Sequence, residues 1–121
     1  MKTTDNSELL KMSLNYAMSV IDFSSELEDA QKKVIAQKLL EAGIGISSNL
    51  YQARKSKRKS DFDFNMSRAL KNTKDSLYWI NQCLKSENYP KNPELKLFGE
   101  LLEKEIYKIL SGNINENELP S

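Results

Sequence analysis

The chain has 121 residues, the size of a single domain, and Leu, Ile, Val and Phe make up about a quarter of it, enough for a packed core. Its 18 Lys and Arg residues nearly balance its 17 Asp and Glu residues, and the net charge of +1 argues against a uniformly basic nucleic-acid binder while allowing a local basic patch. Histidine is absent and Cys83 is the single cysteine, which excludes histidine-based catalysis, an intramolecular disulfide and paired-cysteine zinc sites. No apolar run is long enough to span a membrane, and the first residues lack the apolar stretch of a secretory leader, so we expect a cytoplasmic protein.

The first predicted helix covers residues 7–23 and carries two apolar stripes rather than one. One stripe consists of Leu10, Leu14, Ala17 and Ile21. The other consists of Leu9, Met12, Tyr16, Val20 and Phe23. Together they are wider than the face that a surface helix normally buries, so one stripe is expected to face the core and the other a second subunit. We assign the second stripe to an oligomer or partner interface.

Two further helices are predicted from capping patterns and periodicity. Ser25 followed by Glu28 fits a capping box and predicts a helix over 28–57. Gly43 and Gly45 lie inside this helix, and their spacing lacks the strand and the Lys-Ser/Thr of a phosphate loop, so we interpret them as sites of close helix packing. A second capping-type pair, Ser60 and Asp63, predicts a helix over 61–87.

The fourth predicted helix covers 94–111, with Asn92 as its N-cap and Pro93 at its first position. Gly112 is expected to end it, leaving 113–121 as a polar tail. Four amphipathic helices joined by short connections predict an all-α fold, an antiparallel up-down four-helix bundle over 1–112.

Several segments resemble a bacterial four-helix-bundle family. The run Gln37–Asn49 resembles the family's second-helix pattern, with matches at Leu39, Leu40, Gly43, Ile46 and Asn49, followed by Ala53. Residues 11–17, 60–62, 69–71, 77–80 and 108–111 agree in order and spacing. Glu41, Ile44 and Gln52 stand where the family usually has Arg, Thr and Glu.

The family is that of proteins encoded in intervening sequences of 23S ribosomal RNA genes, and it includes the accessory variability determinant of diversity-generating retroelements. The resemblance implies an antiparallel bundle that assembles into a homopentameric ring. It also implies nucleic-acid binding and, for the retroelement member, partnership with a reverse transcriptase.

The clearest charge asymmetry lies between residues 54 and 74, which carry a net charge of +6 while the rest of the chain carries −5. The basic residues are Arg54, Lys55, Lys57, Arg58, Lys59, Arg68, Lys71 and Lys74. One interpretation is contact with nucleic-acid phosphates. The other is a solvated helix end, where cations are favourable near a helix C-terminus.

Trp79 lies off the predicted core stripe of its helix. It is expected at a subunit or partner interface, with a position at the edge of the core or base stacking as the alternatives.

The sequence therefore predicts a non-enzymatic, homo-oligomeric protein that binds RNA or an RNA/DNA hybrid through the basic segment. A retroelement reverse transcriptase is an expected partner, and no metal, cofactor or membrane partner is expected. The alternative is a structural or protein-interaction bundle without a nucleic-acid ligand, because the net charge is nearly neutral and the apolar arc of the first helix is wide.

Overall fold

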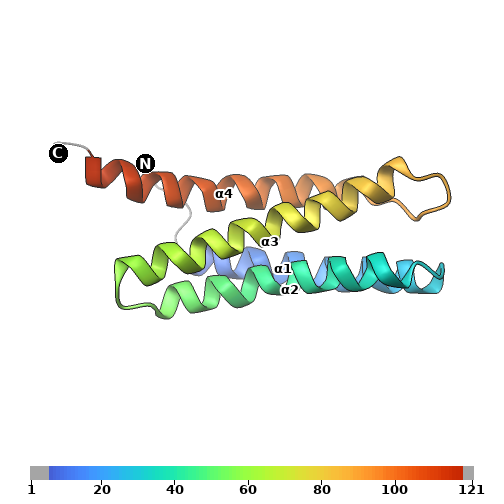
Figure 1. The fold of residues 1–121 in the computed structure, drawn as a ribbon, viewed down its shortest axis with the longest axis horizontal. Helices are drawn as coiled ribbons and strands as arrows, with labels where there is room; N and C mark the ends of the chain where they lie inside the picture. The colour runs from blue at the N-terminus through green and yellow to red at the C-terminus, as the bar shows by residue number, and fades with distance from the viewer. Residues whose placement is uncertain (1–5, 119–121) are drawn as a thin grey trace.

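The structure is a computed structural model that describes the backbone of residues 6–118 and the side chains of residues 7–112. It contains four helices, α1 (Asn6–Asp29), α2 (Lys33–Lys55), α3 (Lys59–Lys85) and α4 (Pro93–Glu118), and no strand within the described residues. Successive helices run in opposite directions (Figure 1). Each helix contacts its neighbours in the chain, and α1 also contacts α4, which closes the bundle. The expected all-α four-helix bundle is confirmed.

The core consists of apolar side chains from all four helices. Its largest fully buried members include Tyr16 and Phe23 from α1, Ile46 from α2, Met66 and Ile80 from α3 and Leu102 from α4. Gly43 and Gly45 allow close packing on two sides of α2. A Cβ atom at Gly43 would lie 2.8 Å from the Val20 side chain of α1, and one at Gly45 would lie 2.6 Å from the Asn72 side chain of α3. The interpretation of both glycines as close-packing sites is confirmed.

The connection between α1 and α2 corrects the predicted boundary at Ser25. That residue lies inside α1, which continues to Asp29, so the Ser25–Glu28 pair does not open a helix. The helix ends in a Schellman motif, in which the Lys32 amide donates to the Leu27 carbonyl at 2.8 Å and the Gln31 amide donates to the Glu28 carbonyl at 2.9 Å. Gln31 occupies the left-handed position with φ of 66°. Glycine is usual there, and its absence hid this helix end in the sequence.

Two other predicted helix ends are also wrong. The N-cap of α3 is Arg58 and makes no side-chain capping bond, so the Ser60–Asp63 pair does not cap this helix. Gly112 does not end α4, because the helix continues to Glu118 and includes most of the predicted tail; residues 119–121 lie outside the described residues. The start of α4 is confirmed, since the Leu95 amide donates to Asn92 Oδ1 at 3.0 Å.

The bundle separates its connections into two ends. The α1–α2 turn and the α3–α4 loop lie at one end, where Lys32 Nζ is 4.5 Å from the centroid of the Tyr89 ring. The α2–α3 junction lies at the other end (Figure 1). This separation isolates the run of basic residues 54–59 from the other connections.

Candidate nucleic-acid interface

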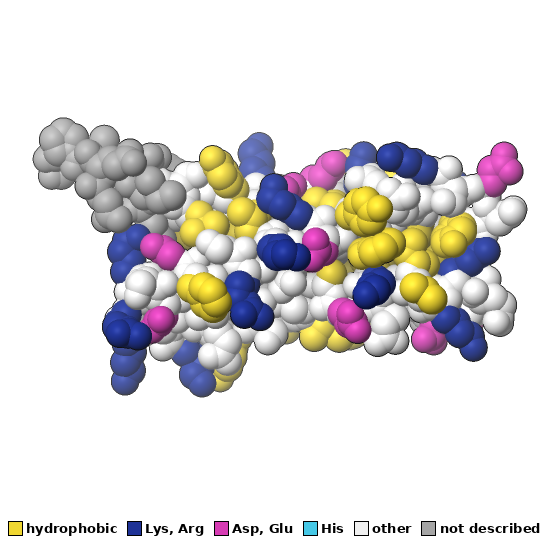
Figure 2. Space-filling view, in the orientation of Figure 1, with side chains coloured by type: hydrophobic (Ala, Val, Ile, Leu, Met, Phe, Trp, Pro, Cys, Tyr) yellow, Lys and Arg dark blue, Asp and Glu magenta, His cyan; other side chains and the backbone are white. Residues whose placement is uncertain are grey.

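The α2–α3 junction presents a dense set of cations to solvent. Arg54 and Lys55 form the last turn of α2, Lys57 and Arg58 lie in the connection, and Lys59 begins α3. All five residues are exposed. Figure 2 shows dark blue side chains gathered at this end of the molecule. We call residues 54–59 the basic junction.

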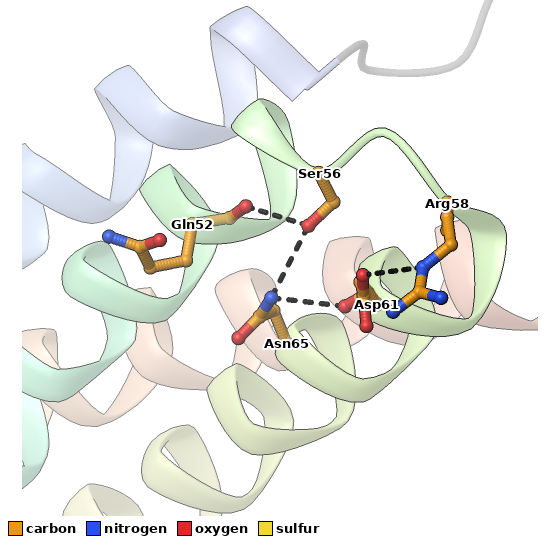
Figure 3. A network of polar contacts seen from close by, with 5 residues as sticks. All are labelled: Gln52, Ser56, Arg58, Asp61 and Asn65. Atoms are coloured by element: carbon orange, nitrogen blue, oxygen red, sulfur yellow. Dashed lines mark hydrogen bonds and ion pairs between the residues drawn. The ribbon is translucent and has the colours of Figure 1, made fainter.

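A polar network holds the basic junction in a defined shape (Figure 3). Ser56 Oγ donates to the Gln52 carbonyl at 2.8 Å and accepts from Asn65 Nδ2 at 3.3 Å. Asn65 Nδ2 also donates to the Asp61 carbonyl at 3.0 Å, and Arg58 Nε donates to Asp61 Oδ2 at 3.2 Å. The network connects the last turn of α2 with the first turns of α3. The cations of the junction therefore lie on two helix ends and on a bonded connection of three residues, 56–58, rather than on a long loop.

Ion pairs divide the eight basic residues of the predicted site into two halves. Four of them contact a carboxylate within the chain: Arg58 with Asp61 (3.2 Å), Lys59 with Asp63 (2.7 Å), Lys71 with Asp75 (3.0 Å) and Lys74 with Glu103 (3.1 Å). Arg54, Lys55, Lys57 and Arg68 form no ion pair within the described residues. These four are the cations whose charge is open to an external anion.

The length of α3 separates two of the eight predicted basic residues from the basic junction. At about 1.5 Å per residue, Lys71 and Lys74 lie about 18 and 22 Å from Lys59 along the helix axis. Lys74 is paired with α4 instead. The structure does not bring Lys71 and Lys74 to the basic junction, whereas Arg68 lies only about 13 Å along the helix from Lys59.

Two exposed aromatic residues, which the sequence analysis did not single out, flank the basic junction. Tyr51 of α2 is 49% exposed, and Lys55 Nζ lies 5.1 Å from its ring centroid. Phe64 of α3 is 59% exposed, and the Arg68 guanidinium carbon lies 5.5 Å from its ring centroid. In both pairs the aromatic residue precedes the cation by four residues on the outer face of a helix. That spacing is visible in the sequence and was the available signal.

The interface predicted on the first helix is wrong. Leu9, Tyr16, Val20 and Phe23 are buried in the core, and Met12 is half-buried against it, so these five side chains do not form an outer surface. The physical reason is that α1 touches two neighbours, α2 through Val20 and α4 through Tyr16, and this stripe lies between them. The exposed apolar residues of α1 are instead Leu14, Met18 and Ile21, at 50%, 63% and 42% exposure. We call these three residues the apolar α1 face.

Trp79 lies at the edge of the core, half-buried and packed against it, as one of the alternatives foresaw. Its ring meets the exposed Tyr78 ring edge-on, with centroids 4.8 Å apart. Both rings line an open hollow of about 470 Å³ between α2 and α3, together with Lys38, Glu41, Ala42, Asn72 and Asp75. The interface expected for Trp79 stays a prediction, since its ring is accessible from this hollow.

Buried reactive groups are few in the described part of the chain. Burial raises the pKa of the Cys83 thiol, although Lys91 nearby partly opposes the rise. Burial also raises the pKa of Tyr16 to about 12. No group of three metal-ligating side chains occurs within the described residues. None of the described helices is both long and apolar enough to cross a bilayer.

Comparison with known proteins shows the fold. One crystal structure, of a protein of unknown function from the S23 ribosomal protein family of Bacteroides thetaiotaomicron VPI-5482, superimposes with a TM-score of 0.81. The alignment covers 88% of this chain and 97% of that chain, at 20% sequence identity. No protein-family model matches the sequence, and no curated protein matches it.

Proposed function

We propose that this chain is a non-enzymatic accessory protein that binds RNA or an RNA/DNA hybrid through its basic junction. The observation that carries the proposal is the cluster of Arg54, Lys55 and Lys57, three exposed cations without an ion pair in the described residues, at the end of α2 and on the connection held by the Ser56–Asn65 network. Neutralising phosphates releases condensed counterions, so such a cluster favours a polyanion. Arg58 and Lys59 add to it, because exposed ion pairs contribute only about 0–1 kcal/mol and exchange readily for a phosphate.

The fold and the sequence resemblance add support at different levels. The structural neighbour belongs to a family named for a ribosomal protein, and its own function is unknown. The quoted sequence segments resemble the family encoded in 23S ribosomal RNA intervening sequences, and we propose membership of that family. A retroelement reverse transcriptase is the protein partner that this resemblance suggests.

The proposed protein is homo-oligomeric, and the apolar α1 face supports this part of the proposal. Leu14, Met18 and Ile21 follow one another at helical spacing, and Ile21 lines a hollow with Leu40 of α2, so the face continues onto the next helix. Exposed apolar patches of this kind are typical of protein interfaces. The number five comes from the resemblance, because a two-fold dimer is the commonest soluble oligomer.

Light scattering tests the oligomer independently of nucleic acid. We expect the wild-type protein to have a molar mass larger than that of a monomer at micromolar concentration. Met18→Lys places a charge on a position that is 63% exposed, and it should reduce the molar mass of the assembly. A monomeric wild-type protein would refute the proposed oligomer and would not bear on nucleic-acid binding by the basic junction.

Fluorescence anisotropy across a salt series tests the nucleic-acid proposal. The probes are a labelled structured RNA and a labelled RNA/DNA hybrid. We expect the logarithm of the association constant to fall linearly with the logarithm of the salt concentration. For a duplex, the slope of this line should be about −0.9 for each phosphate contact. Arg54→Glu/Lys55→Glu/Lys57→Glu should abolish binding.

A matched control separates the site from overall charge. Lys33, Lys85 and Lys104 are also exposed and form no ion pair within the described residues. Lys33 and Lys85 lie at the opposite end of the bundle, and Lys104 lies about midway along α4. Changing these three to Glu alters the net charge equally and should leave most of the binding. Equal loss in both triple variants, or no binding by the wild type, would contradict the proposal.

A bundle that binds only proteins is the second candidate function. The specific observation in its favour is the apolar α1 face together with the hollow beside Trp79. The anisotropy salt series distinguishes the two candidate functions, because a bundle that binds only proteins has no salt-dependent affinity for nucleic acid.

A further inference from the structure

Exposed aromatic rings and cations alternate around the basic junction in a way that the charge cluster alone does not explain. Tyr51 precedes Lys55 on α2, and Phe64 precedes Arg68 on α3. Tyr51 lies about 6 Å before the end of α2, and Phe64 lies about 7.5 Å after the start of α3, at about 1.5 Å per residue. Because the two helices are antiparallel and packed together, both rings lie at a similar depth from the same end of the bundle.

Folding of the bundle does not account for either ring. The Tyr51 and Phe64 side chains are about half exposed or more, whereas Tyr16 is fully buried and packs edge-on against Phe98, with ring centroids 5.2 Å apart. An exposed cation–π contact contributes only about 0.5–1 kcal/mol. The two outer side chains therefore leave about half or more of their surface available to a ligand.

We propose that Tyr51 and Phe64 are stacking platforms for the bases of an unpaired nucleic-acid strand, with Lys55 and Arg68 contacting the adjacent phosphates. This inference rests on the proposed function and narrows its ligand to single strands. Sequence-tolerant binders of single strands combine basic grooves with aromatic faces on which bases stack. Neither Lys55 nor Arg68 has an ion pair in the described residues, so each holds a charge beside its ring.

A duplex does not fit this arrangement equally well. Its bases are already stacked and paired, so a protein recognises it through phosphates, shape and groove edges. The cations of the basic junction would attract a duplex and a single strand alike, whereas the rings contribute only where bases are free. The structure therefore predicts a preference for single strands that depends on the two rings.

The test compares ring-removing variants on matched probes. Tyr51→Leu, Phe64→Leu and the double variant keep an apolar, helix-favouring side chain and leave every charge in place. Tyr107→Leu removes a 61% exposed ring from α4 and is the matched control. Labelled oligouridylate, oligothymidylate and an RNA duplex of the same length are titrated by anisotropy.

We expect each single variant to weaken single-strand binding by about 5- to 150-fold, the range for loss of one base–aromatic stack. Duplex affinity and the salt slope should stay unchanged, and Tyr107→Leu should bind like the wild type. Loss on either oligonucleotide supports the stacking site, and the ratio of the two affinities separates RNA from DNA as the preferred strand.

Two results would overturn the stacking site while leaving the proposed function intact. In the first, the double variant binds single strands as tightly as the wild type, while the Arg54→Glu/Lys55→Glu/Lys57→Glu protein does not bind. In the second, light scattering shows that Tyr51→Leu changes the assembly without changing binding, which would place Tyr51 between subunits. Absence of wild-type binding to all three probes, and also to the structured RNA and the RNA/DNA hybrid, would overturn both proposals.

Discussion

Removal of the Tyr16 hydroxyl perturbs a buried hydrogen-bond chain that crosses the core from α1 to α3. Ser76 Oγ lies 2.8 Å from the Tyr16 hydroxyl and donates to the Thr73 carbonyl at 2.8 Å. Because a serine hydroxyl has one proton, Tyr16 is the donor in its contact with Ser76. Both side chains are completely buried, so neither has water as a substitute partner.

The geometry predicts unequal costs for the two single substitutions. Tyr16→Phe removes a donor but leaves Ser76 bonded to Thr73, and we expect the free energy of unfolding to fall by about 1 kcal/mol. Ser76→Ala leaves the Tyr16 hydroxyl buried without its acceptor, which costs about 1–3 kcal/mol. The double variant should be less destabilised than the sum of the two, because it leaves no unsatisfied hydroxyl.

The pH dependence of stability in alkaline solution gives a second test of the Tyr16 hydroxyl. Burial raises the pKa of the Tyr16 phenol from 10.0 to about 12, and the hydrogen bond with Ser76 opposes this in part. The folded state therefore favours the neutral phenol. Its contribution to stability is complete below pH 10.0 and is lost as the pH rises toward about 12. Two pKa units correspond to about 2.7 kcal/mol.

Urea unfolding followed by far-UV circular dichroism measures both effects. The wild type and Tyr16→Phe are compared at neutral pH and across the alkaline range, so that any pH dependence common to both proteins cancels in the difference. We expect wild-type stability to fall more steeply with pH, so that the two proteins converge and then cross. An identical pH dependence, or a smaller cost for Ser76→Ala than for Tyr16→Phe, would refute the reasoning.

Three further substitutions test the local structure, each by the same unfolding measurement. Gln31→Gly should stabilise the protein by about 0.5–1 kcal/mol, because Gln31 occupies a left-handed position at φ of 66°; a loss of stability would contradict this. Asn92→Ala should cost about 1 kcal/mol through loss of the bond to the Leu95 amide, whereas an unchanged midpoint would show that the cap is dispensable. Gly43→Ala should cost about 1–2 kcal/mol, because its Cβ would lie 2.8 Å from Val20, and Val20→Ala in the same chain should recover part of that loss.

The basic residues of the candidate site could be predicted from the sequence, but their ion pairs only in part. The cations of residues 54–59 follow from the sequence, and their position at a helix junction follows from the periodicity on either side. The pairs of Arg58, Lys59 and Lys71 are spaced three or four residues apart on one helix, which the sequence shows. The pair of Lys74 with Glu103 does not follow from the sequence, because it forms only through the packing of α3 against α4. The exposure of Tyr51 and Phe64 likewise depends on which side of each helix faces the core.

The sequence by itself determined the four helices and the start of α4, because helical periodicity and the Asn92–Pro93 cap act within a few residues. Only the tertiary structure decided which apolar stripe of α1 is buried. Both stripes satisfy the same local pattern, and the choice depends on where α2 and α4 lie around α1. The end of α1 was decided in the same way: Ser24 Oγ donates to the Ala36 carbonyl of α2, so packing continues where a capping pattern suggested a break.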